Sequence, residues 1–209
     1  MARKMDVDVT GKQFTRGWFR ARNLSTFREH LYPKWAGKPI IYLELGVFEG
    51  MSLLWMFQHI LTHPESRAVA VDPWLMTSKM TSQAMEQVMG RAYHNLNFVA
   101  GTRCHIVRAN SVEALTRMSH RGGFLGITRK SVDVCMIDGD HNAGAVLDDA
   151  RWVLPLMKKG SWLLFDDVEN DKPKANHVKH GLSMFLDEHP DDMALVWKHR
   201  YVECYEVLR

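Results

Sequence analysis

Acidic residues follow two of the apolar runs that the sequence offers as buried strands. Ile137 is followed by Asp138-Gly139-Asp140-His141, and Phe165 is followed by Asp166 and Asp167. The carboxyl ends of neighbouring parallel strands share one edge of a sheet, so these acids are expected in one cleft. Crowded carboxylates raise one another's pKa, and a divalent cation relieves the crowding; oxygen ligands favour Mg²⁺, Mn²⁺ or Ca²⁺ over zinc. The alternative is that one or two acids cap helices while the others face solvent.

A third apolar run ends in a turn that contains two glycines, Glu44-Leu45-Gly46-Val47-Phe48-Glu49-Gly50. Gly46 and Gly50 allow a tight turn and a close approach of the backbone to a ligand. A pyrophosphate-binding loop requires the pattern GxGxxG, and Phe48 stands where its second glycine would be. Glu44 disfavours an anion at this turn and suits a cation, such as a sulfonium or an ammonium group. A plain turn with no ligand is the alternative.

Two further strand ends carry polar residues that could bind a nucleoside. Asp72 follows an apolar run and could accept hydrogen bonds from both ribose hydroxyls, as an acid does at this place in dinucleotide-binding folds. Trp74 could form a wall against adenine, or belong to the core. Asn110 and Ser111 could meet the adenine edge, or cap the following helix.

The elements that position these residues alternate along the chain. Strands are expected at residues 40–45, 68–71, 105–107, 132–137 and 162–165, with helices at 51–61, 79–95, from 111, 143–157 and 173–188. This alternation predicts an α/β fold, a mostly parallel sheet with helices on both faces. Two closing strands, near 193–198 and 202–208, are too close in sequence for a helical crossover and should form an antiparallel hairpin.

The first 38 residues are expected to form a separate helical lid or a substrate-side wall, and residues 39–209 the ligand-binding domain. Phe14, Trp18 and Ala21 are spaced for one helical face, and Thr26 with Glu29 matches a capping box. This segment holds nine Lys or Arg residues against three acids, whereas the remainder holds 18 against 21. A basic arm could meet nucleic acid or an anionic substrate, and a solvated helix face is the alternative.

Composition and cysteine usage indicate a globular protein of a reducing compartment. The 209 residues are 46% hydrophobic and 24% charged, and no apolar run approaches the roughly 20 residues of a membrane span. The N-terminus lacks the apolar stretch of a secretory signal, and the three cysteines form no CxxC pair. A cytoplasmic location and no membrane partner are expected, and homo-oligomerisation stays open.

Four motifs in order resemble those of the class I S-adenosylmethionine-dependent methyltransferases. They are ELGVFEG at 44–50, VDPW at 71–74, VCMIDGDH at 134–141 and LLFDDV at 163–168. The IDGDH element is similar to a branch that includes metal-dependent sugar O-methyltransferases of antibiotic biosynthesis and cephalosporin hydroxylase-like proteins. The likeness covers residues 39–208 and implies a Rossmann-like, seven-stranded sheet with an antiparallel closing hairpin.

The resemblance also implies a role for each matching residue. The methionine end of S-adenosylmethionine would lie against Glu44, Gly46 and Gly50, with Asp138 also in contact with this cofactor. The nucleoside would lie against Asp72 and Trp74, with Asn110 and Ser111 near the adenine. The ligands of a divalent cation, Mg²⁺ by preference, would be Asp138, Asp166 and Asp167, and His141 would be the base.

These expectations favour metal-assisted O-methylation of a small hydroxylated acceptor. A bound cation would lower the pKa of the acceptor hydroxyl, and His141 with Asp138 would handle its proton. Two alternatives stay open: a nucleic-acid methyltransferase that uses the basic N-terminal arm, and a cofactor-binding module without catalysis. An NAD-dependent oxidoreductase is disfavoured because GxGxxG is absent.

Overall fold

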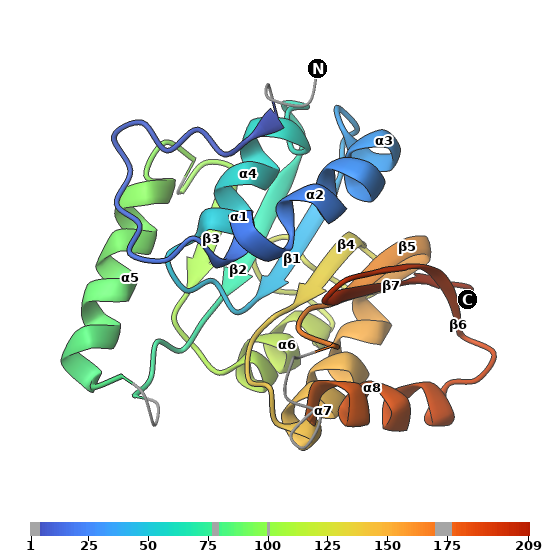
Figure 1. Ribbon diagram of the computed structural model, residues 1–209. Coiled ribbons are helices and arrows are strands. Elements are labelled where there is room, and N and C mark those ends of the chain that lie inside the picture. Colours follow the sequence, from blue (N-terminus) through green and yellow to red (C-terminus); the bar gives the residue numbers. More distant parts are fainter. Residues whose placement is uncertain (1–4, 77–79, 100, 170–176) are drawn as a thin grey trace.

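Seven strands form one mixed sheet in the order β3-β2-β1-β4-β5-β7-β6 (Figure 1). The structure is a computed structural model and describes residues 5–76, 80–99, 101–169 and 177–209. The first five strands run parallel, and β7 pairs antiparallel with both β5 and β6. The strands are β1 (Ile41–Leu45), β2 (Arg67–Val71), β3 (Cys104–Val107), β4 (Val132–Ile137), β5 (Met157–Phe165), β6 (Met193–His199) and β7 (Val202–Val207).

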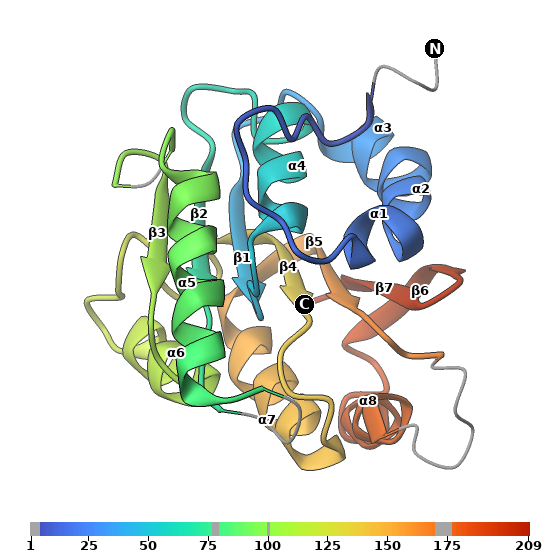
Figure 2. The same ribbon diagram turned by 60° about the vertical axis from the view of Figure 1, so that its left-hand side comes forward.

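Helices cover both faces of the sheet, so the molecule has three layers (Figure 2). One face packs against α4 (Met51–His59), α5 (Ser82–Leu96) and the N-terminal helices, and the other against α6 (Ser111–Ser119), α7 (Ala143–Val153) and α8 (His177–Glu188). The N-terminal helices are α1 (Trp18–Arg22), α2 (Leu24–Thr26), a π-helix over Phe27–Leu31, and α3 (Tyr32–Trp35).

Alternation along each strand supplies both cores. In β4, Val134 and Met136 join the core beneath α4 and α5, whereas Cys135 and Ile137 join the core beneath α7 and α8. Apolar residues on both faces are expected of a parallel strand that helices cover from both sides. The expected α/β fold, a Rossmann-like sheet of seven strands with an antiparallel hairpin, is confirmed.

Several predicted boundaries differ from those of the structure. The helix expected to reach residue 157 ends at Val153, because a short 3-10 turn that contains Pro155 follows it and β5 already begins at Met157. The helix expected from residue 79 begins at Ser82, where the Thr81 hydroxyl accepts a hydrogen bond from the Ala84 amide. The last helix was expected from 173; residues 173–176 lie outside the described part of the chain.

The helical face predicted for Phe14, Trp18 and Ala21 forms only in part. Phe14 precedes the first helix, which begins at Trp18. The capping box is wrong: Thr26 has helical backbone angles, so it cannot be an N-cap, and its buried hydroxyl has no hydrogen-bond partner. The chain instead continues as the π-helix. The sheet is complete without this segment, but the core beneath α4 is not, because it includes Phe19, Phe27 and other N-terminal side chains.

Among the residues that the structure describes, none of the helices combines the length and the apolar character that a membrane span requires.

Candidate active site

The loops after β1 and β4 are pressed together at the carboxyl edge of the sheet. Leu45 pairs with Ile137, and the Asp138 amide donates to the Leu45 carbonyl at 2.8 Å. Gly46 has a φ of +89°, and a Cβ on it would lie 1.9 Å from the Asp138 carbonyl oxygen. Gly50, at a φ of +79°, precedes α4 and packs against the Leu96 side chain. Contacts within the protein therefore already require both glycines.

Asp72 fixes the turn that contains these glycines. Its Oδ2 accepts hydrogen bonds from the amides of Val47 (2.8 Å) and Phe48 (2.9 Å), and its Oδ1 accepts one from the Trp74 amide. The Trp74 indole donates to the Phe48 carbonyl at 2.9 Å and is only 2% exposed, so its ring belongs to the core beneath the turn. Asp72, which is predicted to bind the ribose, thus also fixes the shape of the β1 loop, which is predicted to bind the methionine end of S-adenosylmethionine.

Ser111 and Asn110 lie at the start of α6, where the structure gives them different surroundings. Asn110 is exposed at the N-cap position, and its side chain makes no capping hydrogen bond. The Ser111 hydroxyl donates to Oδ1 of Asp149 on α7 at 2.5 Å. Asp149 is buried behind the β4 loop, close to Gly139, and burial raises its pKa to about 6. The sequence motifs did not single out Asp149.

The carboxylates of Glu44, Asp138, Asp166 and Asp167 form one group, here called the acidic cleft. Glu44 is fully buried; its Oε1 accepts a hydrogen bond from the Ser52 hydroxyl, and its Oε2 has no hydrogen-bond partner. Burial raises the pKa of Glu44 to about 7, against the opposing hydrogen bond from Ser52. An acceptor atom left buried in this way is suited to a cationic donor such as an ammonium group.

Asp138 and Asp166, which directly follow β4 and β5, affect each other's pKa. Burial raises the pKa of Asp166 well above its usual value, and the nearby charges of Asp138 and Asp167 raise it further. The pKa of Asp138 is raised in the same way, first by burial and then by Asp167 and Glu44. The predicted crowding of carboxylates after β4 and β5 is therefore present.

Two residues of the N-terminal segment contact this cleft, and the sequence motifs did not identify them. The Asn23 amide nitrogen donates to Asp166 Oδ2 at 2.7 Å, and the Arg22 guanidinium donates to Asp167 Oδ1 at 2.8 Å. Each carboxylate keeps its other oxygen free of these contacts: Asp166 Oδ1 is buried without a hydrogen-bond partner, and Asp167 Oδ2 faces His141. Asn23 and Arg22 therefore orient the carboxylates and leave one oxygen of each available.

His141 lies between two of the acids at the solvent side of the cleft. Its Nε2 is 3.8 Å from Asp138 Oδ1, and its Nδ1 is 3.6 Å from Asp167 Oδ2. Both distances exceed a hydrogen bond, and the side chain is 46% exposed. An imidazole held loosely beside two carboxylates, and open to solvent, can accept a proton from a ligand.

The donor atoms of the acidic cleft suit a hard cation, but they are not gathered around a single point. Among the described residues, one group of three or more His, Cys, Asp or Glu has ligand atoms that all lie within 4.8 Å of one another: Glu29, His30 and His199. The carboxylates of Asp138, Asp166 and Asp167 would have to move closer together to share a cation. Their oxygens, one of them buried without a partner, still match the ligand chemistry of Mg²⁺.

Residues 5–23, here called the N-terminal strap, cross the β1 loop and end at the acidic cleft. Glu49 of that loop accepts hydrogen bonds from the Thr15 amide and hydroxyl, both at 2.7 Å, and from Arg91 at 2.6 Å. Farther along the strap, the Trp18 ring packs on the Phe48 ring, with centroids 4.9 Å apart. The strap is therefore fastened to the β1 loop before it reaches the acidic cleft.

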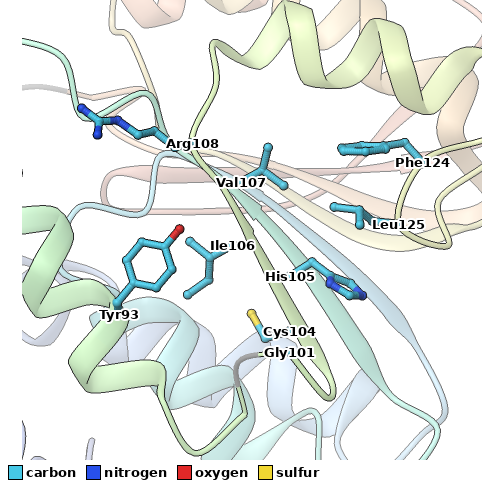
Figure 3. Close-up of a pocket in the computed structure, with 9 residues that line it drawn as sticks. All are labelled: Tyr93, Gly101, Cys104, His105, Ile106, Val107, Arg108, Phe124 and Leu125. Carbon is cyan, nitrogen blue, oxygen red and sulfur yellow. The ribbon is translucent and has the colours of Figure 1, made fainter.

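A shallow groove of about 430 Å³ lies away from these residues, along the edge strand β3. Tyr93 of α5 and Phe124 lie on either side of the strand, whose residues Cys104–Val107 form the floor (Figure 3). None of the predicted site residues lines this groove.

Sequence comparisons agree with the geometry. A family model described as a methyltransferase domain matches residues 43–168. The uncharacterized protein R132 of Acanthamoeba polyphaga mimivirus is 25% identical over 131 residues, which make up 63% of this chain and 52% of that protein. The chain thus spans about half the length of this relative.

Solved structures with the same fold have low sequence identity to the chain. MycE of the mycinamycin biosynthetic pathway, in complex with Mg and SAH, has a TM-score of 0.59 at 17% identity, over 94% of this chain and 51% of MycE. A putative O-methyltransferase from Klebsiella pneumoniae has a TM-score of 0.58 at 16% identity, over 95% of this chain and 84% of that protein. CalS11, a TDP-rhamnose 3'-O-methyltransferase of calicheamicin biosynthesis, has a TM-score of 0.54 at 14% identity, over 87% of this chain and 76% of CalS11. These likenesses show the fold.

Proposed function

We propose that this chain, which belongs to the family of methyltransferase domains, catalyses the O-methylation of a small hydroxylated acceptor with the help of a divalent cation. The family inferred from the four sequence motifs is confirmed by the match over residues 43–168. The observation that carries the reaction is the acidic cleft, in which Asp166 holds a buried oxygen without a partner among neighbouring carboxylates.

The methyl donor would be S-adenosylmethionine, which supplies an activated methyl group on a sulfonium. Its ammonium group would find an acceptor in the buried Glu44 Oε2. Asp72 would receive the ribose hydroxyls while it keeps the β1 loop in shape through the Val47 and Phe48 amides. Asn110 and Ser111 would lie nearest the adenine.

The cation would be held by Asp138, Asp166 and Asp167, and would lower the pKa of the acceptor hydroxyl. Asn23 and Arg22 have the role of outer-sphere partners, since each binds one oxygen of a ligand carboxylate and leaves the other free. His141 would take the proton from the acceptor hydroxyl on an imidazole nitrogen. In-line methyl transfer then depends mainly on alignment in a cleft from which water is excluded.

The N-terminal segment would form the acceptor side of the site, which refines its expected role as a lid or wall. Trp18 and Phe48 form an aromatic pair at the β1 loop, which would suit an apolar face of the acceptor. Nucleic acid is a weaker candidate for the acceptor because two of the basic residues here bind acids of the chain itself: Arg22 pairs with Asp167, and Arg20 with Asp6.

The proposal is tested by metal removal together with two kinds of substitution. Activity on hydroxylated acceptors should vanish with EDTA and return with Mg²⁺ or Mn²⁺. Asp166→Asn should weaken Mg²⁺ binding, because the amide keeps the shape and removes the charge. His141→Ala should keep Mg²⁺ binding while the rate falls by roughly 10²–10⁴-fold, the usual scale for loss of a general base. S-adenosylhomocysteine binding, measured by calorimetry, should persist in both variants.

Full activity in metal-free protein would refute the metal-assisted reaction and leave the methyltransferase family standing. Loss of S-adenosylhomocysteine binding in His141→Ala would instead place that residue in the cofactor site.

A further inference from the structure

Two histidines and a glutamate meet at the edge strand β6, and none of the three belongs to the acidic cleft. Glu29 and His30 belong to the π-helix, and His199 is the last residue of β6. Their ligand atoms all lie within 4.8 Å of one another, and His199 Nδ1 is 3.7 Å from Glu29 Oε2. The three residues come from segments about 170 positions apart in sequence, which the fold brings together.

The two imidazoles are held in place by their surroundings. The His30 ring stacks on the Trp197 ring at 4.7 Å, with 15° between the planes, and meets the His199 ring edge-on at 5.5 Å. Trp197 and His199 are both on β6, so one strand positions both contacts of His30. Rings fixed in this way lose little freedom when they bind a ligand.

The state of the polar atoms also favours a ligand. His199 Nδ1 is buried and has no hydrogen-bond partner, because its 3.7 Å separation from the Glu29 carboxylate is too long for a hydrogen bond. Burial and the neighbouring His199 lower the pKa of His30, against the opposing charge of Glu29, and this favours the neutral imidazole, the form that binds metals. Glu29 is 60% exposed and supplies a negative charge that solvent can reach.

We propose that Glu29, His30 and His199 form a binding site for a transition-metal ion of the zinc type, separate from the acidic cleft. Two imidazole nitrogens and one carboxylate oxygen are ligands that Zn²⁺ takes in tetrahedral sites, with water as the fourth ligand. Imidazole suits Zn²⁺, Ni²⁺ and Cu²⁺, whereas Mg²⁺ prefers oxygen, so the two sites select different ions. Ligand atoms around one Zn²⁺ stand roughly 3.3 Å apart, given bonds of about 2 Å, so the observed spacing needs only a small closure.

An ion at this site would link the N-terminal segment to the closing hairpin. The π-helix follows α2 directly, and α2 follows Arg22 and Asn23. Arg22 contacts Asp167, and Asn23 contacts Asp166. Binding at Glu29, His30 and His199 therefore favours the arrangement in which those two residues reach the acidic cleft. The ion would hold these two segments together, and it adds no ligand to the proposed reaction.

Zinc titration of the full chain after EDTA treatment and dialysis tests the proposal. Calorimetry should show one tight Zn²⁺ equivalent that millimolar Mg²⁺ does not displace. His30→Ala and His199→Ala should each weaken it by at least about 100-fold, since loss of an outer-sphere partner alone costs roughly 10–100-fold. Zn²⁺ should raise the melting temperature of the wild type and leave that of His30→Ala unchanged.

A double variant, His177→Ala with His180→Ala, is the matched control. These two histidines are exposed and three positions apart on α8, and their loss should leave the tight Zn²⁺ equivalent unchanged. Co²⁺ should give the absorption of a tetrahedral nitrogen–oxygen site in the wild type and in this control, and not in His30→Ala. Wild-type zinc affinity in both His30→Ala and His199→Ala, or loss of the tight equivalent in the control, would overturn the proposal. If His199→Ala does not fold, the results for His30→Ala decide.

Discussion

Replacement of Glu49 by glutamine tests how the N-terminal strap is attached to the β1 loop. The Glu49 carboxylate is 1% exposed and accepts hydrogen bonds from the Thr15 amide, the Thr15 hydroxyl and the Arg91 guanidinium. Glutamine keeps the shape but removes the charge, and it turns one acceptor into a donor that faces other donors. The substitution therefore leaves the Arg91 charge without its partner and the Thr15 groups partly unsatisfied.

The size of the effect follows from the burial of the pair. Loss of one partner of a buried ion pair costs about 3–5 kcal/mol. The Arg91 side chain is 20% exposed, so water compensates part of its charge, and we expect the free energy of unfolding to fall by about 2–4 kcal/mol. With a urea m-value of about 2–3 kcal/mol/M, the midpoint of unfolding should move down by about 1 M.

Urea denaturation of wild type, Glu49→Gln and a surface control measures this directly. The control is Glu86→Gln, which breaks the pair between Glu86 and Arg108, in which both side chains are nearly half exposed. That change should cost no more than about 1 kcal/mol. Equal midpoint shifts in the two variants would refute the reasoning, because burial would then not distinguish the two ion pairs.

Two further predictions concern the β1 strand and loop. Gly46→Ala should destabilise the protein by about 3 kcal/mol or more in thermal denaturation, because the new Cβ would lie 1.9 Å from the Asp138 carbonyl oxygen. Gly50→Ala should destabilise it less, because its Cβ would meet only the end of the Leu96 side chain. Equal losses of stability in the two variants would contradict this difference. Burial raises the pKa of Glu44 from 4.5 to about 7, so the folded state favours the protonated acid. The free energy of unfolding should therefore decrease as the pH rises from about 4.5 through about 7, by at most about 3 kcal/mol. Glu44→Gln should flatten that decrease in urea denaturation between pH 5 and 8, and parallel slopes in the two proteins would rule out the assignment.

The sheet could be predicted from sequence because its signal is local. Each central strand is a short apolar run followed by polar residues, and the hairpin follows from the spacing of its strands. The early start of β5 was missed because Lys158, Lys159 and Gly160 interrupt the apolar pattern. Those residues lie at the outer end of the strand, where Lys158 pairs with Asp133 on β4.

The acidic cleft was only partly predictable, because only part of it follows from local sequence patterns. Its acids follow strands that pair with one another, so their proximity could be inferred from the order of the elements. Arg22 and Asn23 are 145 and 143 residues from their partners, and no local pattern indicates such contacts. The π-helix was missed because Thr26 and Glu29 match a capping box, whereas burial of Phe27 and Leu31 in the core sets the actual backbone.

The contacts between the N-terminal strap and the β5 loop have a consequence for how the chain folds during synthesis. Asn23 leaves the ribosome 143 residues before Asp166, which at ~5–20 residues per second is about 7–30 s. During that interval Trp35, which the finished protein buries, lacks its ring partner Trp162 on β5. Contacts of such long sequence separation form late. Arg22 and Asn23 are thus made long before the acids that they contact, so the acidic cleft is completed late in folding, and the Trp35 side chain can be bound by chaperones until β5 is made.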